Sequence, residues 1–348
     1  MNIAVIGAGV IGYASAFELA SRGARVRIYD MRVPGQGATR ASAGMLAPHI
    51  EAHEDVLRRL GKASLALYDN FISRVTEASG TTIEYRPTGT LQVAASEADD
   101  DVLKAKAEDL EVHGIRHRLL NGDEVADLEP MLRKPARGLL IPEHRYVKAI
   151  DLMRALEAAA GSHGVTFIRQ HIDRPDPAAL GADAVVVATG SWSGGFQPPL
   201  PVKPIRGQVV QLQLPTPLIG HIVWGKGCYL VPWVDGSLLV GATSEDVGFD
   251  ESTTEAGTRQ LLDAAATVLP GAATASITEV RAGLRPATPD ELPLIGPSST
   301  TRGVYFATGH YRNGVLLAPL TAQLIADLVL SGREDPMLAP VRPARFNL

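Results

Sequence analysis

Cysteine, long apolar runs and blocks of one charge are nearly absent from this sequence. Cys228 is the only cysteine among 348 residues, which excludes an intrachain disulfide and a Cys-x-x-Cys zinc or redox motif. Lys and Arg number 33 against 38 Asp and Glu. This balance leaves no basic run of the kind that binds nucleic acid or an anionic membrane surface, so we predict neither partner.

No stretch reaches the ~18 consecutive apolar residues that a membrane span requires. Asn2 leads directly into an apolar strand pattern, without the basic and apolar regions of a signal peptide. We therefore expect no membrane span and a cytoplasmic location. With 45% hydrophobic and 20% charged residues, the composition is that of a globular protein with room for two domains.

The first recognisable motif is "IAVIGAGVIG" at residues 3–12, which places Gly7, Gly9 and Gly12 in the pattern G-x-G-x-x-G. A buried-type strand precedes it, a helical stretch follows, and a second strand ends at Asp30. Gly7 permits a tight turn, Gly9 lets the backbone approach a pyrophosphate, and Gly12 permits close packing of helix on strand. The order of these elements predicts a dinucleotide site, and the carboxylate of Asp30 disfavours a 2′-phosphate.

Three further segments favour a flavin over a nicotinamide. Residues 31–50 are small and glycine-rich where a simple NAD enzyme would continue with another strand–helix–strand unit. A buried strand ends in Ala-Thr-Gly, so that backbone at Thr189 and Gly190 can pass close to a cofactor. Near the C-terminus a strand leads through a turn at Gly309 into a helix, whose N-terminus could stabilise the negative charge of a reduced flavin.

These segments resemble the D-amino-acid oxidase family of FAD-dependent oxidoreductases, and within it the glycine oxidases of thiamine biosynthesis. The resemblance extends over residues 1–335 and is carried by four motifs: "RASAGMLAP" (40–48), "CYLVPWVDGSLLVGAT" (228–243), "AGLRPATPDELPLIG" (282–296) and "GHYRNGVLLAP" (309–319). It implies an α/β (α+β) fold with two domains of the GR2 type, a Rossmann-like FAD-binding domain and a substrate domain built on an antiparallel sheet.

The resemblance also implies which residues contact FAD. The family most often has Glu where Asp30 stands, so the shorter carboxylate has less reach to the ribose. Some relatives attach FAD through a cysteine or histidine that these motifs lack, so we predict noncovalent binding. Added to the motif glycines, Thr189 and Gly190, the expected contacts are Val10, Ile11, Asp30, Met31, Thr39, Arg40, Ala43, Gly44, Met45, Ile172, His310, Tyr311, Arg312, Asn313, Gly314, Val315 and Leu316.

Three residues are candidates for substrate binding and catalysis. A guanidinium at Arg285 can bind a substrate carboxylate in a bidentate manner, although a surface arginine is the alternative. Tyr229 could donate to the same carboxylate or gate the site, and the alternative is a core tyrosine on an alternating strand. Arg312 could face the flavin edge or the substrate, or pair with a surface acid. For His310 we expect a structural role, since hydride transfer from a neutral amine needs no protein base.

The resemblance implies oxidative deamination of glycine or another small amino acid, with oxygen or a different electron acceptor. A dehydrogenase acting on D-amino acids, proline or sarcosine stays open, as does a non-enzymatic FAD-binding subunit. The sequence leaves the oligomeric state open, a homo-oligomer included. Aromatic residues above Arg285 would admit only small side chains, and the candidates are Trp224, Tyr229, Trp233 and Tyr311.

We expect the FAD-binding domain to comprise residues 1–82, 141–203 and 285–348. The inserts 83–140 and 204–284 together should form a single sheet over the flavin. Histidines four residues apart with two nearby glutamates have a metal-ligand spacing, but acids in the first turn of a helix have an ordinary electrostatic explanation. We therefore predict no metal site at His49, Glu51, His53 and Glu54.

Overall fold

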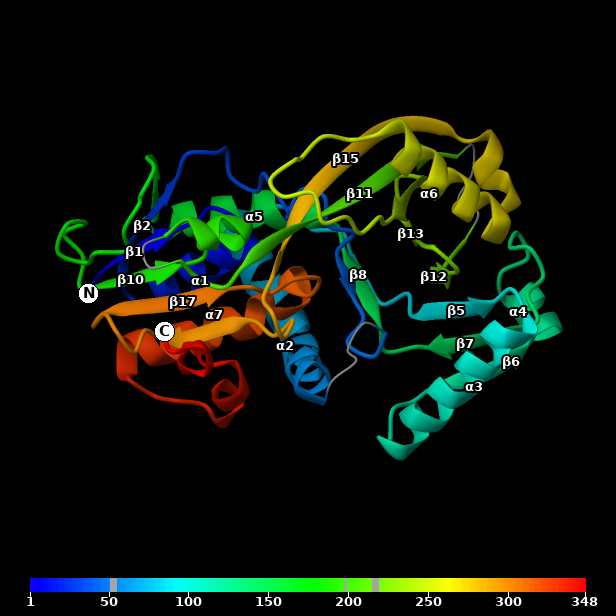
Figure 1. Ribbon diagram of the computed structural model, residues 1–348, viewed down its shortest axis with the longest axis horizontal. Coiled ribbons are helices and arrows are strands. Elements are labelled where there is room, and N and C mark those ends of the chain that lie inside the picture. Colours follow the sequence, from blue (N-terminus) through cyan, green and yellow to red (C-terminus); the bar gives the residue numbers. More distant parts are fainter. Residues whose placement is uncertain (51–54, 197–198, 215–218) are drawn as a thin grey trace.

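The computed structural model describes residues 1–50, 55–196, 199–214 and 219–348. Two regions lie side by side: one combines a parallel sheet with most of the long helices, and the other contains a large, mostly antiparallel sheet (Figure 1). Both termini lie on the region with the parallel sheet (Figure 1). The predicted two-domain α/β fold is therefore confirmed.

The first sheet has six strands, and all neighbouring strands are parallel except the pair at one edge, residues 294–297 and 304–308, which is antiparallel. Its two central strands, at residues 2–6 and 184–187, are almost wholly apolar and buried, as is typical of parallel strands that are covered on both faces. In spatial order the strands are β16 (Leu294–Pro297), β17 (Val304–Thr308), β10 (Ala184–Val187), β1 (Asn2–Ile6), β2 (Arg25–Asp30) and β9 (Thr166–Arg169).

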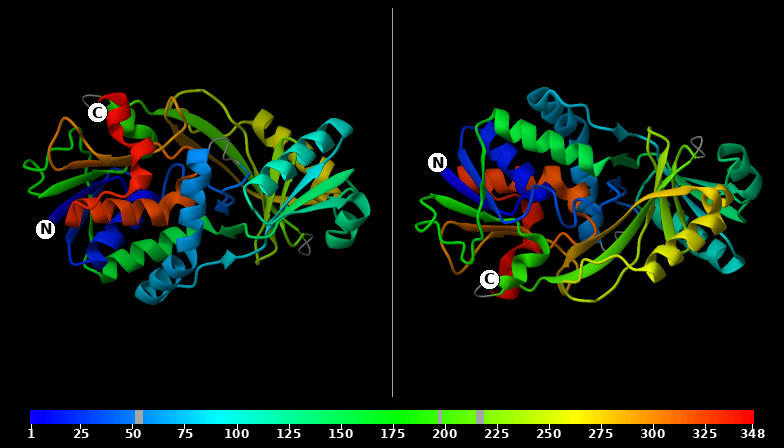
Figure 2. Two further views of the ribbon diagram at one scale, coloured as in Figure 1. Left: turned by 90° about the horizontal axis from the view of Figure 1, so that it is seen from below. Right: turned by 90° about the horizontal axis from the view of Figure 1, so that it is seen from above.

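Four helices pack together beside this sheet: α1 (Val10–Ser21), α2 (Asp55–Ser79), α5 (Ala149–Ser162) and α7 (Gly314–Ser331) (Figure 2). Helix α1 contacts α5 and α7, and α2 contacts the same two helices. Their apolar faces, together with the inner strands, form the largest core of the molecule.

Helix α7 bears on the expectation that the chain has no membrane span. Its 18 residues and mean hydropathy of 1.7 satisfy the criteria for a membrane span by length and composition. A search for consecutive apolar residues does not find this helix, because Thr321, Gln323 and Asp327 interrupt the apolar run. In the structure 78% of the helix is buried, and a helix that is apolar on all sides is typical of a protein core. Its composition is therefore explained by packing against α1 and α2.

The second sheet has eight strands, antiparallel throughout except for the pair β12–β5. Strands from both inserts join it, which confirms that they form one sheet. Its spatial order is β15 (Ser276–Ala287), β11 (Lys203–Gln213), β14 (Ser237–Gly241), β13 (Cys228–Pro232), β12 (Ile222–Gly225), β5 (Thr90–Ala94), β7 (Arg137–Ile141) and β6 (Arg118–Asn121).

Shorter elements complete the described fold. A three-stranded sheet of β3 (Met45–Leu46), β8 (Arg145–Val147) and β4 (Tyr85–Arg86) joins the chain segments that lead into and out of the first insert. Helices α3 (Glu97–Val112), α4 (Gly122–Leu128) and α6 (Glu255–Val268) pack on the eight-stranded sheet. Four 3-10 helices occupy Gly190–Gly195, Pro270–Thr274, Pro336–Val341 and Pro343–Phe346.

Strands β11 and β15 pair over their whole length, from Lys203 opposite Ala287 to Gln213 opposite Ser276. The expected domain boundaries near residues 203 and 285 both lie at the same end of this ladder. The long pair therefore extends from the second sheet toward the first, and its end lies beside the pocket described below.

Candidate active site

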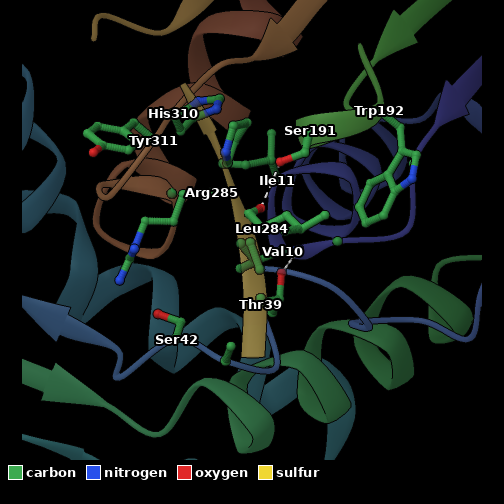
Figure 3. A pocket seen from close by; sticks show the side chains of 18 of the residues that line it. Val10, Ile11, Thr39, Ser42, Ser191, Trp192, Leu284, Arg285, His310 and Tyr311 are labelled. Atoms are coloured by element: carbon green, nitrogen blue, oxygen red, sulfur yellow. Dashed lines mark hydrogen bonds between the residues drawn. The ribbon is translucent and has the colours of Figure 1, made fainter. Parts of the chain in front are cut away.

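A single large pocket lies where the two regions meet (Figure 3). Its volume is about 1210 Å³, which exceeds the ~300–1000 Å³ of an ordinary small-molecule site. The carboxyl ends of β1, β2 and β10 line it from one side, and strands β11–β15 line it from the other. Such a volume can hold a dinucleotide together with a small second ligand.

The glycine motif forms one wall of this pocket. Gly7 has a φ of +112°, and a side chain there would lie 2.3 Å from the carbonyl oxygen of Ala188. A Cβ at Gly12 would lie 1.9 Å from the carbonyl oxygen of Gly7. Gly9 faces the pocket, where a Cβ would only touch Thr39 Oγ1 at 3.4 Å. The three roles expected for these glycines therefore match their surroundings.

Helix α1 starts at this wall with no acidic residue in its first turn. Its N-terminal partial charge therefore acts on the pocket. Figure 3 shows Thr39 accepting a hydrogen bond from the backbone N–H of Val10, at 3.1 Å between nitrogen and Oγ1. Ile11, Ala43, Gly44 and Met45 line the same wall.

Asp30 lies at the pocket, where the sequence places it, but its carboxylate already has two backbone partners. Oδ2 accepts from the N–H of Ala8 at 2.8 Å, and Oδ1 accepts from the N–H of Arg32 at 2.9 Å. The carboxylate thereby joins the glycine turn to the end of β2. Met31 and Ile172 line this end of the pocket as well.

The loop before α7 closes the opposite end. Gly309 has a φ of +72° and Tyr311 a φ of +47°, and the N–H of Tyr311 donates to the carbonyl of Pro286 at 2.9 Å. The guanidinium of Arg312 stacks on the Tyr311 ring at 5.0 Å. Helix α7 then starts at Gly314 without a side-chain cap or an acidic residue in its first turn, so its N-terminus also faces the pocket.

His310 is buried between this loop and α7. Its Nε2 lies 3.0 Å from the hydroxyl of Thr321. Burial lowers the pKa of His310 to about 3, so the ring is neutral at physiological pH. This environment agrees with a structural role.

Arg285 projects from β15 into the pocket (Figure 3). One nitrogen, Nη1, donates to the carbonyl oxygens of Thr243 at 3.0 Å and Arg206 at 3.5 Å. The ion pairs found among the described residues do not include Arg285, so its charge has no carboxylate partner there. The other edge of the guanidinium is thus available to a ligand.

Two glycines that the sequence analysis did not single out make room for the candidate side chains. A Cβ at Gly207 on β11 would lie 2.3 Å from Nη2 of Arg285. A Cβ at Gly241 on β14 would lie 2.3 Å from the phenol ring of Tyr229. Both glycines line the pocket. Gly241 is the direct cross-strand partner of Tyr229, whereas Gly207 pairs with Gly283, two residues from Arg285.

Tyr229 and Trp224 form an aromatic wall near Arg285. They are cross-strand partners on β12 and β13, and their ring centroids are 5.3 Å apart. Met45 lines the same pocket. The expectation that Trp233 lies above Arg285 was wrong, because Trp233 does not line the pocket. It follows the end of β13 and is buried in the core, 3% exposed, with the ammonium of Lys148 over its ring.

Four residues expected at the cofactor do not line the pocket. Gly12 acts through helix–strand packing, and Asn313 immediately precedes α7. The guanidinium of Arg40 pairs with Glu279 at 2.8 Å. The carbonyl of Leu316 accepts from the hydroxyl of Ser64. Pocket residues that the sequence analysis missed include Ser42, Ser191, Trp192 and Leu284 (Figure 3).

The histidine–glutamate spacing near residue 50 is only partly described. His49 pairs with Glu143 at 2.6 Å and stacks on His144. Glu51, His53 and Glu54 lie outside the described residues. Within the described ranges, no cluster of three His, Cys, Asp or Glu side chains is arranged to hold a metal ion.

Comparison with known proteins now adds to this geometry. Residues 2–328 match the model of the DAO family, described as FAD dependent oxidoreductase. This chain belongs to that family. It is 35% identical to glycine oxidase of Geobacillus kaustophilus, over 97% of this chain and 95% of the relative. The crystal structure of a glycine oxidase from that organism superposes with a TM-score of 0.94 over 99% of this chain and 98% of the other.

Two further members of the DAO family define the range of similarity. The bifunctional protein ThiO/ThiG of Trichormus variabilis is 35% identical over 99% of this chain, and the chain spans only 55% of that relative's length. Iminodiacetate oxidase from Chelativorans is 27% identical, with a TM-score of 0.90 over 98% of each chain. The chain thus corresponds to a whole glycine oxidase and to about half of a bifunctional protein.

The pocket fits the FAD that the DAO family uses. The N-terminal residues of two helices, α1 and α7, line it, and neither helix has a side-chain cap from its own N-cap residue. Glycines 7, 9, 44 and 190 bring backbone to its surface, and a Cβ at Gly190 would meet no atom within 4 Å. Positive helix ends suit the pyrophosphate at one end and an electron-rich flavin edge at the other.

Proposed function

We propose that this protein is an FAD-dependent oxidase of glycine or another small amino acid. The observation that carries the proposal is Arg285, whose guanidinium faces the pocket without a carboxylate partner among the described residues. The reaction is glycine + O2 + H2O → glyoxylate + NH3 + H2O2. The names of the relatives that this chain matches over nearly their full length support glycine as the substrate.

In this proposal Arg285 binds the substrate carboxylate, because a planar guanidinium matches a carboxylate with two parallel hydrogen bonds. Tyr229 lies on the neighbouring wall, and its hydroxyl donates to the same group. Arg312 borders the site from the loop before α7. Together these side chains hold the Cα–H of the substrate toward the cofactor, and such alignment supplies much of the rate of a bimolecular step.

FAD, bound noncovalently, supplies the two-electron acceptor for the hydride from Cα. Gly7, Gly9, Asp30 and the N-terminus of α1 would hold its dinucleotide part, and the pocket residues among 43–45 and 310–315 would hold its flavin. His310 donates no proton and takes none, since its pKa of about 3 keeps it neutral. Expulsion of water by the aromatic wall protects the product imine until it leaves for hydrolysis.

We further propose that the cofactor and substrate domains have the boundaries given above, and that the product feeds thiazole formation for thiamine. The second proposal is supported by the ThiO/ThiG relatives, in which the matching half is joined to another protein in one chain.

An anaerobic substrate screen tests the proposed function. Purified protein is expected to be yellow, to release flavin on acid treatment, and to bleach with glycine or sarcosine before D-amino acids or prolines. An oxygen electrode and a dye-reduction assay run in parallel then identify the acceptor. Fast dye reduction with slow oxygen uptake would favour a dehydrogenase, and absence of bleaching with every amine would favour a non-enzymatic FAD-binding subunit.

A further inference from the structure

A polar network lies beside Arg285 at the edge of the pocket, which Thr243 of this network also lines. Its centre is the carboxylate of Glu245, in the segment that follows β14. Oε1 of Glu245 accepts hydrogen bonds from Thr243 Oγ1 at 2.5 Å and from Gln208 Nε2 at 2.8 Å. Oε2 accepts from Arg206 Nη2 at 2.5 Å. Three different partners therefore hold one carboxylate.

The three partners of Glu245 are well shielded from water, while the side chain of Glu245 itself is 27% exposed. Gln208 is 0% exposed, and Thr243 and Arg206 are each 4% exposed. Burial alone would raise the pKa of Glu245, but hydrogen bonds from Arg206, Thr243 and Gln208 outweigh it and lower the pKa. The carboxylate is therefore ionised at neutral pH, and its hydrogen bonds to a charged partner are of the stronger kind.

The network reaches Arg285 through backbone atoms of its own members. The carbonyl of Thr243 accepts from Nη1 of Arg285 at 3.0 Å, and the carbonyl of Arg206 accepts from the same nitrogen at 3.5 Å. The backbones of Arg206 and Glu245 are themselves bridged, with N···O distances of 2.8 and 2.9 Å. The carboxylate of Glu245 thus connects the side chains of the two residues whose carbonyls hold the guanidinium, and its backbone N–H donates to the carbonyl of Arg206.

The orientation of the Arg285 guanidinium determines how well it can bind a substrate carboxylate. The guanidinium of Arg285 crosses β11 at Gly207, where it has space on the pocket side. Two parallel hydrogen bonds to one carboxylate require that the plane of the guanidinium be held in one orientation, since both N–H donors lie in that plane. The two carbonyls occupy Nη1, which leaves the remaining edge directed at the pocket.

We propose that Glu245 is a positioning residue for Arg285, acting through Thr243 and Arg206 to orient the guanidinium for the substrate carboxylate. This inference rests on the proposed function, in which Arg285 is the carboxylate anchor. Glu245 itself touches neither substrate nor cofactor in this assignment. Its contribution should therefore appear in carboxylate binding and leave the rate of the bound complex largely unchanged.

The test uses FAD-loaded enzyme and two readouts: KM and kcat for glycine, and the dissociation constant of acetate from the change in the flavin spectrum. Glu245→Ala is expected to weaken acetate and raise KM about tenfold, the effect of one disrupted charge-assisted hydrogen bond, with kcat within about twofold. Glu245→Gln keeps one acceptor for Thr243 and should recover part of the loss. Asp246→Asn, which removes a neighbouring acid paired with Lys203, is the matched control and should behave as wild type.

A double-variant cycle separates positioning from a general structural effect. In an Arg285→Ala background, Glu245→Ala should add nothing to the loss of acetate affinity, because both changes act through one guanidinium. If Glu245→Ala does not fold, Thr243→Val breaks the same connection and takes its place in the cycle.

Additive losses in the cycle, or unchanged acetate affinity in Glu245→Ala, would overturn the inference. The two proposals fail separately, because acetate binding requires no turnover. A wild-type enzyme that oxidises no amine but loses acetate affinity in Glu245→Ala would contradict the proposed function and support the positioning role.

Discussion

At the scale of single residues, Arg285 offers the most direct test of the carboxylate anchor. We expect Arg285→Ala to raise KM for glycine by about 10- to 100-fold, because a charge-assisted hydrogen bond contributes about 1.5–3 kcal/mol. Steady-state kinetics on FAD-loaded protein measures this. Arg285→Lys is the control. It retains the charge without the planar guanidinium, so its KM should lie between those of the wild type and Arg285→Ala. An unchanged KM in the alanine variant would refute the anchor.

His310 should make the protein sensitive to acid. Its pKa is about 3 in the folded state and ~6.5 in an unfolded chain, so the unfolded state binds the proton first as pH falls. The stability that neutral His310 contributes is complete above pH 6.5 and decreases by up to about 1.4 kcal/mol per pH unit on the way to pH 3.

Denaturant unfolding of wild type and His310→Asn between pH 7 and pH 4 checks this prediction. The variant has no titrating ring and should lose less stability over that range. His49 and His144 also have pKa values lowered by burial, but they contribute equally to both proteins. Parallel pH profiles for the two proteins would contradict the assignment to His310.

At the scale of elements, the close approach of strands β11 and β15 decides whether Arg285 can reach the pocket. We expect Gly207→Ala to raise KM for glycine at least tenfold while leaving FAD content unchanged, since the new methyl would lie within 2.4 Å of three guanidinium atoms and must displace them. Kinetics and flavin quantification measure the two effects. Gly161→Ala, where a Cβ meets nothing within 4 Å, is the control, and equal KM values in both variants would argue against this steric reading.

Element boundaries also show what a local pattern predicts well. The strand–glycine–helix pattern at the N-terminus predicts β1 and α1 because their periodicity and turn chemistry are local. The helix before residue 331 was predicted for the same reason. Whether that helix spans a membrane or fills a core could not be read from its composition, because both environments select apolar residues on every side.

At the scale of the whole molecule, the pocket between the two regions should select substrates by size. The paired rings of Trp224 and Tyr229 line the same pocket as Arg285, so we expect a larger side chain to displace Cα from its reacting position. We expect kcat/KM to fall from glycine through D-alanine to D-phenylalanine, measured by oxygen uptake. Sarcosine serves as the control, since its methyl group is on nitrogen. The reverse order would mean that the wall is open and that a general D-amino-acid oxidase is the better description.

Assembly of the site shows why part of it escaped prediction. Gly9 and Asp30 could be predicted to line the pocket because the spacing of the glycine motif fixes the turn and the end of the second strand. Arg285 could be predicted because it lies in a motif that resembles the family. Trp233 was misplaced because alternation was extended past Pro232, where β13 ends. Gly207 lies outside the four motifs and Gly241 lies within one of them, but neither position shows by itself that the glycine lies against Arg285 or Tyr229; only the packing of the paired strands does.

The sequence by itself determined the strand–glycine–helix turn, because that turn depends on neighbouring residues, and it determined the family and the two-domain fold through motifs that resemble the D-amino-acid oxidases. Only the tertiary structure decided which side chains face the pocket, that α7 is a core helix, and that Glu245 is connected to Arg285 through Thr243 and Arg206. These features depend on contacts such as that between Thr243 and Arg285, 42 residues apart in the chain. Such contacts arise from sheet register and packing, which no local pattern specifies.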